Sequence, residues 1–158
     1  LEITDKMLVM ALTTEGELAE RLIENALEDC ISAFDGFARE LCRINAQSSS
    51  NPNEASSISF QNLTGARQKV KALFGLDLTA GLTEREWEVV ITGFQKRHLI
   101  AHKMGVVDRE YILKSGDATA IPGRRLKIGA DEVRQIVQIV NRISENFVDG
   151  LQRLRNGS

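Results

Sequence analysis

Residues 14–44 read TEGELAERLIENALEDCISAFDGFARELCRI. Apolar side chains recur along this stretch mostly at spacings of three and four residues, which places them on one face of an α-helix. The members of this face are Leu18, Leu22, Ile23, Ala26, Leu27, Cys30, Ile31, Phe34, Phe37 and Leu41. The pattern predicts one long amphipathic helix over about 15–44. A capping box is expected to open it, with Thr14 as the N-cap and Glu17 as the third helical residue.

Three later segments repeat the helical spacing. The predicted helices span about 61–74, 84–104 and 132–154. Gly75 is expected to end the first, Thr83–Glu86 forms a capping box for the second, and Asp131 is expected to cap the third. Residues 3–12 form an apolar lead-in whose conformation the pattern leaves open.

Four substantial helices in 158 residues predict an all-α fold, an antiparallel helical bundle forming a single domain over 1–156. The Ser- and Asn-rich stretch 45–57 predicts a long mobile loop, because it buries too little to offset its ordering entropy. The irregular stretch 106–128 allows a short β-hairpin that pairs 111–113 with 126–128. The chain does not begin with Met, which is consistent with a piece of a longer protein.

Composition excludes several classes of protein. No apolar run is long enough for a transmembrane helix, and the first residues lack the pattern of a secretory signal. Cys30 and Cys42 lie twelve residues apart in one predicted helix, roughly 18 Å, so they are expected to be core residues without a disulfide. These features favour a cytoplasmic protein with no membrane partner.

Charge is unevenly distributed. Residues 1–44 carry ten acidic and four basic side chains, whereas the rest of the chain has a net charge of +4. A polyanion would be attracted to the later part of the chain rather than to residues 1–44. Pairing of acidic and basic faces, within one chain or between subunits, accounts for the asymmetry equally well.

The only two histidines lie in the segment RHLIAH, residues 97–102. Histidine has an unperturbed pKa of roughly 6.5, which suits it to proton transfer near neutral pH. His98 and His102 share a helix face, and Arg97 adds a fixed cation. The local net charge over 94–109 is +3. The basic residues that we expect to contact RNA phosphates here are Lys96, Lys103 and Arg109.

Two other interpretations of the histidines stay open. Histidines at positions i and i+4 bind zinc when a third ligand joins them, for which Asp108 or Glu110 is available. Neither a third histidine nor a glutamate directly after the first is present, so no metal is expected. Alternatively, both histidines are surface residues at a helix C-terminus, where a protonated imidazole is mildly favoured.

The segment Arg97–Tyr111 resembles the motif of the HEPN superfamily (higher eukaryotes and prokaryotes nucleotide-binding domains). That motif is an Arg, a polar residue directly after it, and a His a few residues later. Here these are Arg97, His98 and His102, followed by Gly105 and an acidic-aromatic tail. This sequence departs from the usual motif at His98, because an asparagine or aspartate often follows the Arg in the family.

The resemblance implies a metal-independent endoribonuclease, a toxin or antiviral defence effector, whose site forms where two copies of the motif meet in a homodimer. Arg97 and His102 would be the catalytic pair, with His98 assisting. His102 would move a proton at the ribose 2′-hydroxyl or the leaving 5′-oxygen, and Arg97 would stabilise the charge on the phosphoryl oxygens. An antitoxin or further domains are expected partners, and no cofactor is needed.

A second basic group follows at Arg124, Arg125 and Lys127. It either extends a track for RNA or forms an ordinary solvated turn. Two further functions remain as alternatives to catalysis. One is a non-catalytic HEPN-like module for dimerisation or for binding RNA or nucleotides. The other is a small helical regulator with no nucleic-acid ligand.

Overall fold

The computed structural model describes residues 2–156, so residue 1, where the predicted domain begins, lies outside the described part. That part is all-helical, as predicted. The helices are α1 (Glu2–Leu12), α2 (Gly16–Ile44), the 3-10 turn η1 (Ala46–Ser48), α3 (Pro52–Ala55), α4 (Leu63–Phe74), α5 (Glu84–Lys103), α6 (Arg109–Ser115) and α7 (Ala130–Asn156). None of them combines the length and the apolar composition that crossing a membrane requires.

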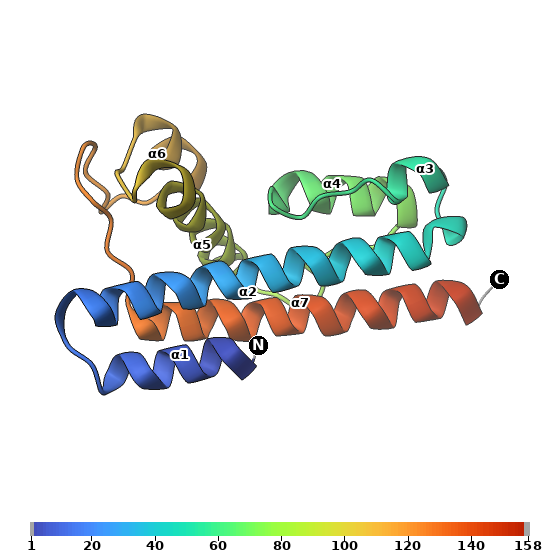
Figure 1. Cartoon of the computed structure of the whole chain (residues 1–158). Coiled ribbons are helices and arrows are strands. Elements are labelled where there is room, and N and C mark those ends of the chain that lie inside the picture. Colours follow the sequence, from blue (N-terminus) through green and yellow to red (C-terminus); the bar gives the residue numbers. More distant parts are fainter. Residues whose placement is uncertain (1, 157–158) are drawn as a thin grey trace.

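The two longest helices, α2 and α7, lie side by side along the whole molecule (Figure 1). They run in the same direction, so the predicted antiparallel arrangement is wrong for this pair. The reason lies in the connection between them. After α2 the chain returns through α3, α4, α5 and the loop before α7 to the start of α2. There the Arg125 side chain donates a hydrogen bond to Glu24. The short helix α1 runs back along the first half of α2.

The core lies between the long pair α2 and α7 and the two helices α4 and α5 that pack on it. Phe34 of α2 stands edge-on to Phe60, with ring centroids 5.7 Å apart, and to Phe94 of α5 at 6.2 Å. Edge-to-face pairs of this kind add to the energy of apolar burial. Cys30 and Cys42 are buried in this core as free thiols, as predicted.

The start of α2 differs from its prediction. Glu15 is the N-cap, its side chain makes no capping hydrogen bond, and the helix begins at Gly16. The Thr14 hydroxyl instead donates to the Met10 carbonyl at 2.8 Å. The predicted capping box is therefore wrong, because the end of α1 uses the hydroxyl first. The lead-in 3–12 is α1 itself.

The prediction that 45–57 is a long loop without regular structure is also wrong, because η1 and α3 lie within it. Ala46 and Ala55 are buried, and the Ser50 amide donates to the Leu73 carbonyl at 2.9 Å. The Asn51 side chain caps α3 by accepting from the Glu54 amide. Two buried alanines and local caps thus stabilise a stretch whose polar composition suggested no regular structure.

The later helices follow the sequence pattern closely. The Thr83 capping box is present, and α5 ends at Lys103, with Met104 in the left-handed region. Asp131 lies inside the first turn of α7 rather than before it, because α7 begins at Ala130.

The predicted β-hairpin is wrong. Residues 111–113 belong to α6, and the described residues hold only one isolated bridge in this region, between Val106 and Arg125. The reason is local, since Asp108 caps α6 by accepting from the Tyr111 amide.

Candidate functional site

The segment RHLIAH, residues 97–102, occupies the last turns of α5 and is called the motif below. Its position is set one turn earlier by Gly93, which lies against Ile136 of α7. A Cβ at Gly93 would be 2.5 Å from the Ile136 Cδ1 atom, so a side chain here would force Ile136 or the helix to move. The packing of α5 on α7 therefore places Arg97.

Arg97 is anchored to α2. Its Nε and Nη2 atoms donate to the two carboxylate oxygens of Glu28 at 2.7 and 2.6 Å. This two-point geometry fixes the plane of the guanidinium. The remaining Nη1 atom makes a long bond of 3.4 Å to the side-chain oxygen of Gln61, and the Arg97 side chain is only 12% exposed. Nη1 is therefore the edge that is most readily turned toward an incoming phosphate.

The two histidines lie next to each other on the exposed surface of the same helix. Their ring centroids are 4.9 Å apart, and the rings are tilted by 53°. Partial burial lowers the pKa of His98, and the positive charges of His102 and Lys103 lower it further. His98 is therefore largely neutral at pH 7, and a neutral imidazole can accept a proton or a hydrogen bond.

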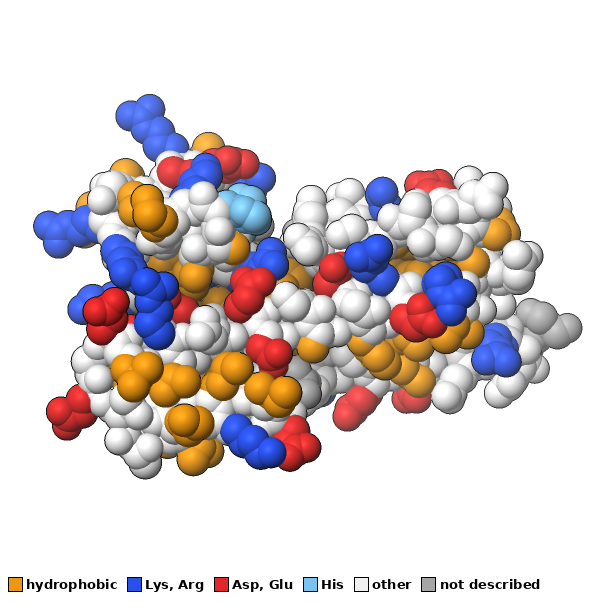
Figure 2. All heavy atoms as spheres, viewed as in Figure 1, with side chains coloured by type: hydrophobic (Ala, Val, Ile, Leu, Met, Phe, Trp, Pro, Cys, Tyr) orange, Lys and Arg blue, Asp and Glu red, His pale blue; other side chains and the backbone are white. Residues whose placement is uncertain are grey.

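A hollow separates the α5–α6 end of the molecule from the α3–α4 layer (Figure 2). Histidine surface borders this hollow, and basic and acidic side chains lie at its floor. The bond between Arg97 and Gln61, which directly precedes α4, joins the two sides. The motif thus lies where a polymer could cross the surface.

Most of the predicted positive charge of this segment is already neutralised. Lys96 is buried, at 8% exposure, and donates to Glu132 of α7 at 2.7 Å. Lys96 is therefore a paired, mostly covered cation rather than a free one at the surface. Lys103 pairs with Asp108 and lies 3.8 Å from Glu110. Within residues 2–156, Arg109 is exposed and makes no ion pair.

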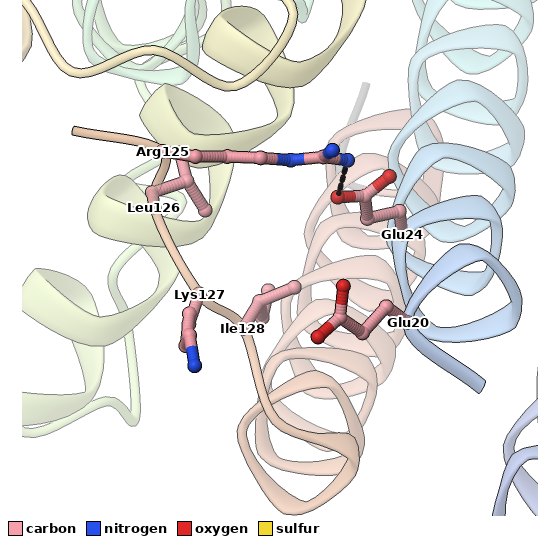
Figure 3. Close-up of a pocket in the computed structure, with 6 residues that line it drawn as sticks. All are labelled: Glu20, Glu24, Arg125, Leu126, Lys127 and Ile128. Carbon is pink, nitrogen blue, oxygen red and sulfur yellow. Dashed lines mark hydrogen bonds and ion pairs between the residues drawn. The ribbon is translucent and has the colours of Figure 1, made fainter. Parts of the chain in front are cut away.

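The second basic group, Arg124, Arg125 and Lys127, also contains both paired and unpaired cations among the described residues. Arg125 reaches across to α2 and donates to the buried Glu24 at 2.9 Å (Figure 3). Figure 3 shows Lys127 directed away from Glu24 and Glu20. Arg124 and Lys127 are exposed and have no ion pair among the described residues. Arg125 therefore holds the loop in place, and the other two are available to a ligand.

Sequence reasoning missed Glu28 and Gln61. Glu28 is one of many acidic residues of α2, and it lies 69 residues before Arg97. Nothing in the local pattern distinguishes it, so only the packing of α5 on α2 shows the pair.

Among residues 2–156, no three His, Cys, Asp or Glu side chains gather in a way that could hold a metal ion. Comparison with protein-family models, with curated proteins and with solved structures gave no match.

Proposed function

We propose that this chain is a metal-independent endoribonuclease of the HEPN type. One observation carries the proposal: the last turns of α5 carry an arginine held by Glu28 and two exposed histidines at the edge of a surface hollow. Cleavage of RNA without a metal needs a base for the 2′-hydroxyl, an acid for the 5′-oxygen, and a cation for the phosphorane. Arg97, His102 and His98 are side chains of these kinds.

In the proposed reaction, the 2′-oxygen attacks the adjacent phosphorus as a histidine removes its proton. The bond from phosphorus to the 5′-oxygen breaks, and a second histidine gives the leaving oxygen its proton. The products are a 2′,3′-cyclic phosphate and a 5′-hydroxyl. Arg97 donates to the non-bridging oxygens, where negative charge grows in the transition state.

A second copy of the chain would complete the site, since two-fold pairing brings two copies of His102 together. Exposed apolar side chains near the motif support a contact surface there. Met104 directly follows α5 and is 82% exposed, and Leu113 of α6 is 86% exposed. Both side chains are therefore available for contact with a second copy.

Arg97→Ala and His102→Ala test this proposal. We expect both to lower the rate of RNA cleavage at least 100-fold, the usual range for losing a proton-transfer group or a charge-stabilising donor. Arg85→Ala is a matched control, because Arg85 is an exposed arginine on the same helix without an ion pair. It should leave cleavage unchanged. Full activity in Arg97→Ala, with thermal unfolding like that of the parent, would refute the proposal.

One observation favours a second candidate, a non-catalytic module of the same type that binds RNA or dimerises. The Arg97 charge is already matched by Glu28, and its side chain is mostly covered. This candidate predicts RNA binding by the native chain with no cleavage at micromolar protein. Glu28→Gln separates the two candidates. If the chain is a ribonuclease, the variant should change the rate of RNA cleavage. If it is a binding module, neither the native chain nor the variant should cleave RNA.

A further inference from the structure

A pocket of about 280 Å³ lies between α5 and the segment that precedes α7. Its lining is unusually basic, with four cationic side chains and a single carboxylate, Asp117. The cations are Lys96, Arg124, Arg125 and Lys127. A pocket with this balance of charge favours an anion over a neutral or cationic ligand.

The partners of these groups show which of them are available. Arg125 is held by Glu24, and Lys96 by Glu132. Asp117 accepts from the Tyr111 hydroxyl at 2.8 Å and from the Thr119 hydroxyl and amide at 2.6 and 3.0 Å, so hydroxyl and amide donors already occupy its oxygens.

Two cations lining the pocket are left without a counter-charge within the described chain. Arg124 and Lys127 are both exposed at its edge. Because neither must break an ion pair to meet a ligand, an anion gains their attraction at little cost.

Backbone hydrogen bonds connect this pocket to the end of α5. The Val107 amide donates to the Arg124 carbonyl at 2.9 Å, and the Gly123 amide donates to the Val107 carbonyl at 2.8 Å. The Leu126 amide donates to the Gly105 carbonyl at 2.9 Å. The basic segment is thus fixed beside residues 105–107, which begin three residues after His102.

We propose that this pocket binds a backbone phosphate of the RNA, on one side of the bond to be cleaved. Arg124 and Lys127 supply the contacts, because Lys96 and Arg125 are already paired with carboxylates. The proposal rests on the ribonuclease function given above. The pocket would recognise the phosphodiester backbone rather than the bases, because its lining contains no aromatic ring on which a base could stack.

The test uses binding of a probe that cannot be cleaved. A fluorescein-labelled, single-stranded 2′-O-methyl RNA is titrated with the full chain at several salt concentrations and followed by fluorescence anisotropy. Arg124→Ala/Lys127→Ala should weaken binding about tenfold at low salt. It should also lower the slope of log affinity against log salt by roughly 0.7–1.4, since each phosphate contact in a single strand contributes about 0.7.

Lys69→Ala/Lys71→Ala is the matched control, because it removes two exposed α4 cations that also lack ion pairs. It should change affinity less than twofold. Equal losses in the two double variants, or no loss in the first, would overturn the proposal. A first double variant that loses affinity for ATP but keeps its affinity for RNA would also overturn it, since the pocket would then serve free nucleotides.

Cleavage assays are read separately, so the two proposals can fail independently. If the chain binds the probe through Arg124 and Lys127 but never cleaves RNA, the pocket stands and the ribonuclease function fails. If it cleaves RNA while both double variants bind and cleave alike, only the pocket fails.

Discussion

Gly93→Ala tests the contact that places the motif. The new Cβ would lie 2.5 Å from the Ile136 Cδ1 atom and 3.1 Å from its Cγ1 atom. Carbon atoms normally approach to about 3.5–4.0 Å, so a shift of roughly 1 Å or more is needed. Ile136 is fully buried, which leaves its side chain little room to move. The helix α5 must therefore shift, or the core must be repacked.

The magnitude follows from two opposing effects. Overpacking a core of this kind costs about 1–3 kcal/mol, whereas alanine in place of glycine inside a helix gains up to about 1 kcal/mol. Gly36→Ala measures the second effect alone, because a Cβ at Gly36 in α2 meets no atom within 4 Å. We expect Gly36→Ala to stabilise the chain by about 0.5–1 kcal/mol, and the two variants to differ by about 1–3 kcal/mol.

The assay is thermal and urea unfolding of the parent and both variants. For a chain of this size, 1 kcal/mol corresponds to roughly 2–4 °C in the unfolding midpoint, so the two variants should be clearly separated. Because Gly93 lies one turn before Arg97, its variant should also reduce RNA cleavage. Equal stabilisation by both substitutions would contradict this prediction, since it would show that Ile136 does not limit the space for a Cβ at Gly93.

Three further predictions concern single groups. The Glu86 pKa falls to about 2, mainly because its carboxylate accepts a hydrogen bond from the Thr83 amide. The ionised Glu86 side chain therefore stabilises the fold fully above pH 4.5, and this stabilisation is lost as the pH falls toward 2. Glu86→Gln should therefore lower stability at pH 7 and weaken its acid dependence, as measured by urea unfolding at several pH values. Burial raises the pKa of Cys30 and of Cys42 to about 12, so neither thiol should react with Ellman's reagent until the chain is unfolded in urea. In an NMR titration, one histidine signal should titrate below the usual value because His98 is partly buried, and His98→Ala should remove that signal.

The long helices were predictable because their apolar spacing is sustained over many residues. The Thr83 capping box was predictable as well, since Thr83 and Glu86 have no competing partner nearby in the chain. The box at Thr14 failed because the pattern does not show that the preceding helix ends at Leu12 and takes up the Thr14 hydroxyl.

Segments whose structure depends on distant packing were not predictable. Nothing in the composition of 45–57 shows that Ala46 and Ala55 are covered by other helices. The same limit applies to the candidate site. The motif located Arg97 and both histidines, but the partners Glu28 and Glu132 come from other helices and decide which cations are free.

We propose that the chain cleaves RNA by attack of the 2′-hydroxyl, without a metal. To test this, the purified chain is incubated with RNA in EDTA, and the product ends are identified by mass spectrometry. We expect 2′,3′-cyclic phosphate and 5′-hydroxyl ends, and no cleavage where the attacking ribose is replaced by 2′-deoxyribose. Cleavage of the deoxy-substituted strand, loss of activity in EDTA, or 3′-hydroxyl ends would contradict it.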